Sequence, residues 1–301
     1  MNEIKKVGFF VNTTKVNAAA VVKGVSMWLK ERDIIALLPD EQAVELGYSR
    51  TGVSKTEVVE AADMLLVLGG DGTLLSAAHT PHIENVPILA INIGTLGFLT
   101  DASLDELYPT LKATLAGDYR IEHRMMLEVV VDRDGFPQPF RAFALNDVVI
   151  RHYTRLIELD AYVDGELFIP YNADGLIIAT PSGSTGYSLS CAGTIVAPQL
   201  EAILLTPIAP HSLTVRPFIA DGDAEITVKM RAAYKSVDVF VDGQRETHSL
   251  AAGSVIKVEK AERTIQLIRS QHHSYYRALR EKLMLGGGIV TSHQSPVTSD
   301  Q

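Results

Sequence analysis

Cysteine is nearly absent from this sequence, because Cys191 is the only one among 301 residues. No internal disulfide can form, which favours a reducing compartment. Long apolar stretches are also missing. No run reaches the ~18 residues that a membrane span needs, and the apolar run near the N-terminus is too short for a signal peptide. We therefore expect a cytoplasmic protein that does not cross a membrane.

Positive charge is scarce as well. The chain has 27 Lys and Arg against 36 Asp and Glu, a formal net charge of −9. Proteins that bind nucleic acid usually carry a basic surplus, so we expect no nucleic-acid partner. A small anionic ligand is compatible with this charge, because backbone N–H groups, helix N-termini and metal ions can all hold phosphates.

Two common nucleotide-binding motifs do not occur. The chain has no Gly-x-x-x-x-Gly-Lys-Ser/Thr loop and no Gly-x-Gly-x-x-Gly following a strand. This argues against a Walker-type nucleotidase and against an ordinary dinucleotide-binding dehydrogenase. The length, at ~150 residues per domain, suggests two domains.

The first third of the chain alternates short apolar runs with helical periodicity. Val7–Val11, Met64–Leu68 and Pro87–Ile93 are compact apolar segments, and Asn17–Arg32 has one apolar helical face. Such alternation predicts a parallel sheet covered by helices on both faces. We therefore expect a Rossmann-like α/β domain over residues 1–122.

The pattern changes near His123, where β-branched runs such as Asp147–Arg151 and Ile157–Val163 begin. Turn signals of the Asp-Gly type separate many of them, which is typical of antiparallel strands. We expect a β-rich, mostly antiparallel domain over 123–270. Residues 271–301 are expected to form a helix that packs back on the first domain, followed by a loose tail.

The segment Gly69-Gly70-Asp71-Gly72-Thr73 lies where a buried strand should lead into a helix. In α/β sheets this position binds ligands, and glycines there let a phosphate approach the backbone and the helix N-terminus. A carboxylate at such a turn is reasonable if it accepts a proton from an attacking hydroxyl or acts through Mg²⁺. The alternative is a plain turn in which Asp71 caps the helix. Lipid kinases and phosphofructokinases carry similar glycine-Asp-glycine turns.

A second segment, Asp174–Ser190, runs from an apolar strand into a dense set of glycine, serine and threonine residues, after which we expect a helix. It offers several N–H and O–H donors for phosphate or ribose oxygens, and Tyr187 adds a flat face for a base. A capping loop is the alternative. Between the two segments, Asn146-Asp147 can contact a purine edge or a ribose diol, or can form a simple Asx turn.

Together these segments resemble the NAD kinase family over roughly Val7 to Tyr276. The first motif is shared with other kinases, whereas the long second segment is specific. The matching pieces occur in the family's order, namely Gly69–Thr73, Asn92–Leu99, Asn146-Asp147, Asp174–Ser190, Pro210–Leu213 with Arg216-Pro217, and Asp242-Gly243-Gln244.

The resemblance implies roles for the matching positions. Asp71 would accept the proton of the adenosine-ribose 2′-hydroxyl of NAD, with Gly72 in the same site. Asn146 and Asp147 would hold the adenosine, and Asp174 would approach the nicotinamide. The remaining NAD contacts implied are Arg155, Asn172, Thr185, Gly186, Tyr187, Ser188, Leu189, Ser190 and Gln244, and the implied phosphate-donor contacts are Gly69, Gly70, Gly72 and Thr73.

The expected activity is that of an NAD kinase, an ATP:NAD 2′-phosphotransferase that forms NADP. ATP is the expected donor, and another triphosphate or polyphosphate is left open. Lys and Arg are not concentrated in sequence around either glycine-rich segment, so we expect Mg²⁺ to offset the donor's charge. No fixed protein ligand for the metal can be assigned. The resemblance also implies a homodimer or homotetramer.

Two other functions compete with this one. A lipid or sphingoid kinase would share the first motif, but it predicts an apolar substrate cleft and no counterpart of Asp174–Ser190. A non-catalytic NAD-sensing protein would use the same pocket and would tolerate the loss of Asp71.

Overall fold

The computed structural model describes residues 3–94, 97–132, 139–231, 237–243, 245–250, 253–271 and 274–284. Gln244, one of the expected NAD contacts, lies outside these ranges. None of the helices in them is long and apolar enough to span a membrane.

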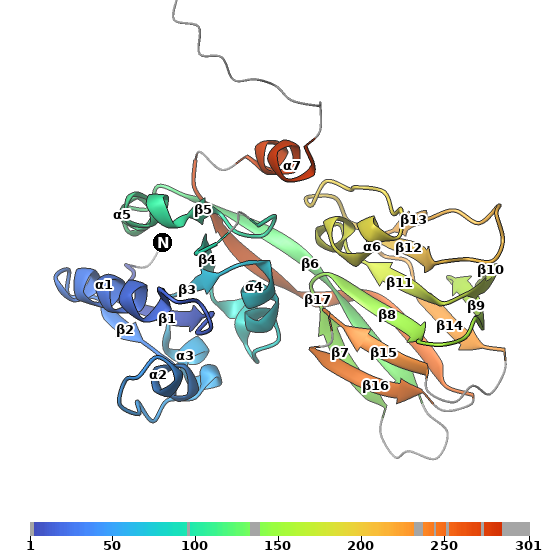
Figure 1. Cartoon of the computed structure of the whole chain (residues 1–301), viewed down its shortest axis with the longest axis horizontal. Coiled ribbons are helices and arrows are strands. Elements are labelled where there is room, and N and C mark those ends of the chain that lie inside the picture. Colours follow the sequence, from blue (N-terminus) through green and yellow to red (C-terminus); the bar gives the residue numbers. More distant parts are fainter. Residues whose placement is uncertain are drawn as a thin grey trace, which may run out of the picture.

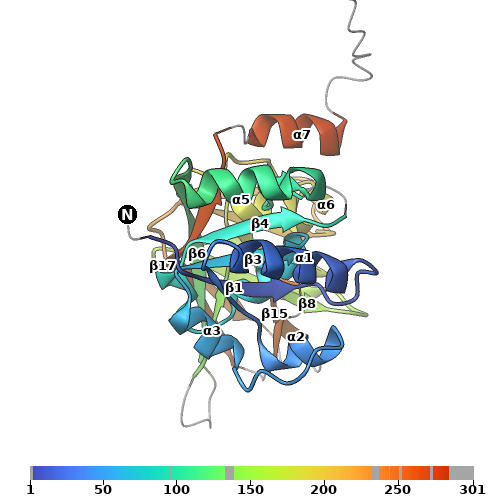
Figure 2. The same ribbon diagram turned by 90° about the vertical axis from the view of Figure 1, so that its left-hand side faces the viewer.

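The N-terminal part is built on a parallel sheet in the order β4-β3-β1-β2. All six residues of β3 are buried, as expected for a central strand covered on both faces. Helices α1 and α5 pack on one face, and α3 and α4 pack on the other. Figure 2 shows α5 and α3 on opposite sides of these strands. The elements are β1 (Lys6–Val11), α1 (Ala18–Lys30), β2 (Ile35–Leu37), α2 (Asp40–Glu45), α3 (Lys55–Ala61), β3 (Met64–Gly69), α4 (Asp71–Ala78), β4 (Ile88–Asn92), β5 (Ala102–Ser103) and α5 (Leu107–Leu115).

The C-terminal part is a sandwich of antiparallel strands. One layer is a six-stranded sheet in the order β13-β12-β11-β8-β15-β16, and the other contains β10, β9, β14, β17, β6 and β7. The elements are β6 (Arg120–Asp132), β7 (Phe140–Ala144), β8 (Asp147–His152), β9 (Ile157–Val163), β10 (Glu166–Ala173), β11 (Gly175–Ala179), α6 (Tyr187–Ser190), β12 (Ala202–Ile208), β13 (Phe218–Asp221), β14 (Ile226–Met230), β15 (Val237–Val241), β16 (Glu246–Leu250), β17 (Val255–Arg269) and α7 (Tyr275–Leu283).

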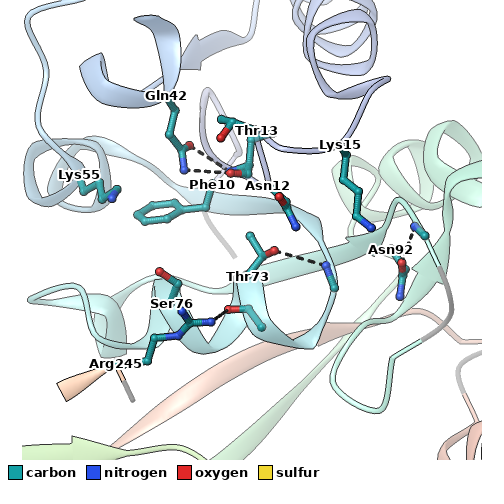
Figure 3. A pocket seen from close by; sticks show the side chains of 14 residues that line it. Phe10, Asn12, Thr13, Lys15, Gln42, Lys55, Thr73, Ser76, Asn92 and Arg245 are labelled. Carbon is teal, nitrogen blue, oxygen red and sulfur yellow. Dashed lines mark hydrogen bonds between the residues drawn. The ribbon is translucent and has the colours of Figure 1, made fainter. Parts of the chain in front are cut away.

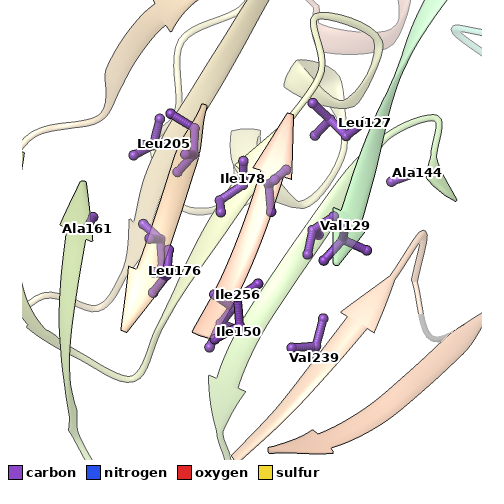
Figure 4. Packing of buried hydrophobic residues seen from close by; sticks show 14 of the residues in the cluster. Leu127, Val129, Ala144, Ile150, Ala161, Leu176, Ile178, Leu205, Val239 and Ile256 are labelled. Atoms are coloured by element: carbon purple, nitrogen blue, oxygen red, sulfur yellow. The ribbon is translucent and has the colours of Figure 1, made fainter. Parts of the chain in front are cut away.

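The sandwich core lies between these two layers (Figure 4). Side chains of a strand alternate between its two faces, so Val148 and Ile150 of β8 enter this core while Val149 points to the opposite side of the sheet. That opposite side carries a smaller apolar cluster that includes Phe240 and Tyr187. The alternation therefore leaves one face of the six-stranded sheet available to line a site.

Two long strands connect the two parts. β17 pairs with β14 and β6 in the sandwich and also with β4 of the parallel sheet, through Leu267 and Ile88. Figure 1 shows β6 and β17 running from one part to the other, with α7 at the top of the view. The expected class, a parallel α/β part followed by a mostly antiparallel β part, is confirmed. The expected boundary between residues 122 and 123 falls inside β6, and the division into separate domains stays a prediction.

Candidate active site

Asp71 is the first residue of α4, and only Gly70 separates it from the end of β3. Its carboxylate does not cap its own helix. Instead Oδ2 accepts the N–H of Phe98 at 2.9 Å, and Oδ1 accepts the N–H of Leu99 at 3.0 Å. The Nζ of Lys282 lies 3.7 Å from Oδ2. The carboxylate is thus aimed by groups from outside its own turn, which excludes the simple capping role.

The loop after β4 reaches Asp71 because position 97 is a glycine. A Cβ on Gly97 would lie 1.9 Å from Oδ1 of Asp71 and 2.7 Å from its Cγ. The N–H of Gly97 is fixed by the hydroxyl of Thr100 at 3.0 Å. This close approach places the two N–H donors of Phe98 and Leu99 on the carboxylate.

One side of α4 borders a cavity of about 390 Å³, which we call the lysine-lined cavity (Figure 3). Lys15, Lys55 and Arg245 line it, and each comes from a different stretch of chain. Arg245 donates to the carbonyl oxygen of Gly72 at 2.9 Å, and Lys55 also pairs with Glu41 at 3.0 Å. The full lining is Phe10, Val11, Asn12, Thr13, Lys15, Gln42, Lys55, Gly70, Gly72, Thr73, Ser76, Asn92, Gly94 and Arg245.

These cations correct an inference from the sequence. Because Lys and Arg are not close in sequence to either glycine-rich segment, only backbone donors and Mg²⁺ were expected to offset an anionic ligand. The fold places three side-chain cations beside the expected phosphate-donor residues Gly70, Gly72 and Thr73. Gly69, the fourth expected donor contact, does not line this cavity. A Cβ on Gly69 would lie 2.1 Å from the hydroxyl oxygen of Thr73.

The other side of α4 borders a second cavity, of about 250 Å³, which we call the tyrosine-lined cavity. Leu75 of α4 lines it, and Leu75 shares a helix face with Asp71 because the two are four residues apart. Arg151 donates to the hydroxyl of Tyr187 at 3.0 Å. The full lining is Leu75, Asn146, Asp147, Val149, Arg151, Tyr153, Tyr187, Phe240 and Gly243.

Asp242 holds the Asn146-Asp147 pair in place. One carboxylate oxygen accepts the N–H groups of Asn146 at 2.7 Å and Asp147 at 3.1 Å, and the other accepts that of Leu145 at 2.8 Å. Asp242 adopts φ of 46° in the turn between β15 and β16, a conformation that Asp tolerates better than most residues. The carboxylate therefore fixes the start of β8 from a distant part of the chain.

His79, at the C-terminal end of α4, links this turn to the helix. Its ring nitrogens lie 3.0 Å from Asp242 Oδ2 and 3.1 Å from Glu246 Oε1. Burial alone would lower the pKa of His79, but the two carboxylates outweigh burial and raise it above its ordinary value. Both ends of α4 are thus tied to groups that line or support the two cavities.

Two segments of the chain match known domains. Residues 7–119 match the ATP-NAD kinase N-terminal domain, and residues 145–270 match the ATP-NAD kinase C-terminal domain. The chain belongs to the NAD kinase family. Helix α7 lies outside both matched segments.

Relatives in the NAD kinase family align along nearly the whole chain. The NAD kinase of Geobacter metallireducens is 42% identical over 285 residues, covering 94% of this chain and 99% of its own. That of Moorella thermoacetica is 43% identical, covering 94% of this chain and 91% of its own.

Two solved structures of the family are similar in fold. Yeast NADH kinase, crystallised with NADH, gives a TM-score of 0.87 at 26% identity, covering 97% of this chain and 91% of that one. An NAD kinase from Archaeoglobus fulgidus in complex with ATP gives 0.69 at 25% identity, covering 93% and 98%.

Within this NAD kinase chain, the specific segment Asp174–Ser190 wraps around Asn146. The backbone carbonyl of Asn146 accepts the N–H of Thr180 at 2.9 Å, and a Cβ on Gly183 would lie 2.0 Å from that same oxygen. A Cβ on Gly186 would lie 3.5 Å from Asn146 Nδ2. Glycine at position 183 therefore lets the segment close over the backbone carbonyl of Asn146, whereas the distance at Gly186 is an ordinary van der Waals contact.

Asp147 and Asn146 present unusual polar groups to the tyrosine-lined cavity. Asp147 is only 4% exposed. Burial, together with the charge of Asp242, raises the pKa of Asp147 to about 7. The Oδ1 atom of Asn146 is buried and has no hydrogen-bond partner in the described part of the chain. Buried polar atoms are normally satisfied, so this oxygen suits a ligand donor.

Other expected NAD contacts lie away from both cavities. The Ser188 hydroxyl is fully buried and bonds the Thr206 hydroxyl at 2.8 Å, and the Thr185 hydroxyl donates to the Ser182 carbonyl at 3.3 Å. α6 is a single short turn. The remaining residues lie at the surface or partly so, with Ser190, Arg155 and Asn172 exposed and Leu189 and Asp174 half-buried.

No preformed metal cage is found in the described ranges. There, no group of three or more His, Cys, Asp or Glu side chains is placed to hold a metal ion. Asp71 is the carboxylate of the Gly69–Thr73 turn. Mg²⁺ commonly uses one or two protein carboxylates together with substrate phosphates and water. The residues present therefore fit an ion that is held largely by the phosphate donor.

Proposed function

We propose that this chain transfers the γ-phosphoryl group of ATP to the 2′-hydroxyl of the adenosine ribose of NAD, forming NADP and ADP. The observation that carries the proposal is the position of Asp71. It stands at the N-terminus of the helix that separates a cationic cavity from a cavity lined by aromatic and buried polar groups. Asp71 itself lines neither cavity, but Gly70 and Gly72 on either side of it line the first, and Leu75, one helical turn further on, lines the second. A proton acceptor next to two such cavities suits the transfer of a phosphoryl group from one ligand to the other.

The lysine-lined cavity is proposed to bind the triphosphate. Its three cations, the open N-terminus of α4 and the glycines of the turn all favour phosphate oxygens. A similar family member from Archaeoglobus fulgidus was solved with ATP, which supports this assignment.

The tyrosine-lined cavity is proposed to bind the adenosine of NAD. Tyr187 offers a flat surface to the base, and Asn146 and Asp147 offer acceptors to the ribose hydroxyls and the amino group of adenine. A similar family member from yeast was solved with NADH. Gly72, which lines the lysine-lined cavity, and Gly186, which lines neither cavity, stay predicted NAD contacts. Arg155, Asn172, Asp174, Thr185, Ser188, Leu189, Ser190 and Gln244 stay predicted contacts.

In the proposed reaction Asp71 accepts the proton of the 2′-hydroxyl as its oxygen attacks the γ-phosphorus. The new bond joins this oxygen to phosphorus, the bond to the β-phosphate oxygen breaks, and ADP leaves. The two backbone donors of Phe98 and Leu99 keep the carboxylate aimed during this step. A divalent cation, which we propose to be Mg²⁺, neutralises charge on the phosphate oxygens when it is bound.

The two competing functions fare differently. The tyrosine-lined cavity carries Asn146, Asp147 and Arg151, which an apolar lipid substrate does not need, and the chain belongs to a different family. An NAD-sensing protein without activity would have the same fold, so only an assay separates it from a kinase.

The assay supplies NAD, ATP and Mg²⁺ and measures NADP with an NADP-specific dehydrogenase. We expect NADP to accumulate and a chelator of divalent cations to stop its formation. Folded protein that binds NAD but forms no NADP would identify the non-catalytic sensor instead. Replacing ATP by other triphosphates or by polyphosphate in the same assay identifies the preferred donor.

We also propose that the chain is cytoplasmic and assembles as a homodimer or homotetramer. The single cysteine supports a reducing compartment. Leu167 of β10 and Phe218 and Ile219 of β13 are 48%, 37% and 43% exposed, which supports an interface at these edge strands. Light scattering of the purified protein tests this, and a monomer at all concentrations would contradict it.

A further inference from the structure

Helix α7 brings a cation to the proposed catalytic carboxylate. Lys282 Nζ lies 3.7 Å from Asp71 Oδ2 and 4.1 Å above the ring of Phe98, whose N–H donates to the same oxygen. We propose that Lys282 is a positioning residue for phosphoryl transfer, which offsets the charge of Asp71 so that the triphosphate can approach it. This inference rests on the proposed function and assigns a role to a helix outside both matched domains.

The placement of Lys282 follows from how α7 packs. The helix begins at Ser274, whose hydroxyl accepts the N–H of Arg277 at 3.3 Å. Tyr275 and Ala278 are 9% and 5% exposed and form its buried face. Lys282 follows them at helical spacing and therefore lies on the same face of α7, toward the protein. Figure 1 shows α7 at the top of the view, above the region where the two parts of the molecule meet.

The ammonium group of Lys282 contacts two neighbours without forming a direct hydrogen bond to Asp71. A distance of 3.7 Å is longer than a hydrogen bond, so the pair interacts chiefly through charge. The ring of Phe98 gives the ammonium a second favourable contact. Lys282 is an exposed residue, but its side chain and that of Asp71 are each only 28% exposed, which makes their interaction less screened than that of a pair in open water.

The charge of Asp71 creates the need for such a partner. A carboxylate repels the phosphates that must come close to it, and this repulsion grows as water is excluded. Lys15, Lys55 and Arg245 line the lysine-lined cavity. In the described part of the chain, Lys282 is the one Lys or Arg within ion-pair distance of the Asp71 carboxylate, and the buried Arg269 interacts with this carboxylate only at longer range. It can therefore reduce the repulsion at the atom where the proton transfer is proposed.

The first experiment compares Lys282→Met with Arg280→Met. The methionine keeps most of the aliphatic stem on Phe98 and removes the charge, while Arg280 is an exposed cation of the same helix. We expect Lys282→Met to raise the KM for ATP roughly three- to fivefold and to lower kcat roughly tenfold. The KM for NAD and the melting temperature should hardly change. Lys282→Arg should recover most of the activity, and Arg280→Met should behave like the unaltered chain.

The second experiment tests whether Lys282 acts through Asp71. The Kd for ATP is measured for Lys282→Met in the unaltered chain and again in an Asp71→Asn background. We expect Lys282→Met to weaken ATP binding in the unaltered chain. In the Asp71→Asn background the same substitution should change the Kd for ATP less than twofold, because the carboxylate charge that Lys282 offsets is gone. Lys282→Gln serves in the same cycle if the methionine variant does not fold.

Either of two results would overturn the inference. One is unchanged kcat and KM for ATP in Lys282→Met. The other is an equal loss of ATP affinity in both backgrounds, which would mean that Lys282 acts independently of Asp71. The unaltered protein is assayed alongside, so the absence of NADP there would reject the proposed function itself.

Discussion

Asp71 and Asp147 are both carboxylates of the candidate site, but their surroundings differ. Asp71 receives two backbone N–H groups and a nearby ammonium. Asp147 is almost fully buried, and the neighbouring charge that affects its pKa is another carboxylate, that of Asp242. Environments that differ in this way suit different roles. Asp71 is suited to meet a reacting hydroxyl, and Asp147 is suited to recognise a ligand.

Asp71→Asn tests the first of these roles. The amide keeps the shape of the side chain and loses its ability to accept a proton. We expect NAD binding to change little, while turnover falls by about a thousandfold or more. Binding of NAD by calorimetry and formation of NADP are the two measurements. Turnover near that of the unaltered chain would show that another group accepts the proton.

Asp147→Asn tests the effect of burial. The folded pKa of Asp147, raised to about 7, lies above its unfolded value. The stability linked to the protonated form is therefore complete below the unfolded pKa of ~3.9 and is lost as pH rises through the folded pKa. The asparagine variant has no such loss. Its stability relative to the unaltered chain should rise by roughly 1–3 kcal/mol between pH 5 and pH 8.

Thermal unfolding at the two pH values measures this difference. Asp33→Asn, at an exposed turn, is the control and should show no pH-dependent change. The KM of Asp147→Asn for NAD should also rise, because the proposed acceptor is altered. A stability difference that is the same at pH 5 and pH 8 would contradict the raised pKa.

At the scale of elements, α4 and the loop after β4 together build the reacting end of the site. α4 separates the two cavities and begins with Asp71, while the loop supplies the donors that orient it. The sequence located the turn at Gly69–Thr73 correctly, because a buried strand followed by glycines is a local signal. It did not reveal that Phe98 and Leu99 would fold onto Asp71, since that contact depends on the path of the loop.

Gly97→Ala tests this contact between loop and helix. The new methyl group would overlap Oδ1 of Asp71, so either the loop or the carboxylate must move. We expect kcat to fall roughly a hundredfold, with the KM for ATP changed much less. Steady-state kinetics measure both constants. Unchanged kcat in a folded variant would show that the orientation set by the loop is not needed.

Element boundaries were predicted well where periodicity was strong. The expected strand Ile157–Val163 is β9, and the expected helix Asn17–Arg32 contains α1. The serine-rich segment was expected to continue into a helix, but α6 has only four residues. There, the hydroxyls of Ser184 and Ser188 bond the backbone of Val196 and the side chain of Thr206, contacts that compete with a longer helix.

At the scale of the whole molecule, a buried charge network joins the two parts. Arg124 of β6 and Arg269 of β17 are each only 1% exposed, and both pair with Glu122. Burial lowers the pKa of Arg124 to about 10. Arg124 also donates to the Ser182 hydroxyl at 3.1 Å, and Arg269 donates to the Leu99 carbonyl at 3.0 Å. The network therefore connects the loop that orients Asp71 with the segment that encloses Asn146.

Glu122→Gln tests the network. The change leaves two buried guanidinium groups without their shared counter-charge, and removing one partner of a buried pair costs about 3–5 kcal/mol. Denaturant unfolding should show a loss of that order. Glu225→Gln, which breaks an exposed pair with Lys257, is the control and should cost less than about 1 kcal/mol. Equal losses in the two variants would show that the buried network adds no special stability.

The sequence by itself determined the class of fold, the position of the Gly69–Thr73 turn with Asp71 between a strand and a helix, and the segment that identifies the family. Each of these depends on a short stretch of chain, because hydrophobic periodicity, glycines and small hydroxyl residues determine local structure. Only the tertiary structure decided what surrounds the Gly69–Thr73 turn and the Asn146-Asp147 pair. Lys282, Arg245 and Asp242 reach the site from distant segments, and their positions depend on how the strands pair and how α7 packs. Charge acts through space rather than along the chain, so these partners could not be read from local sequence.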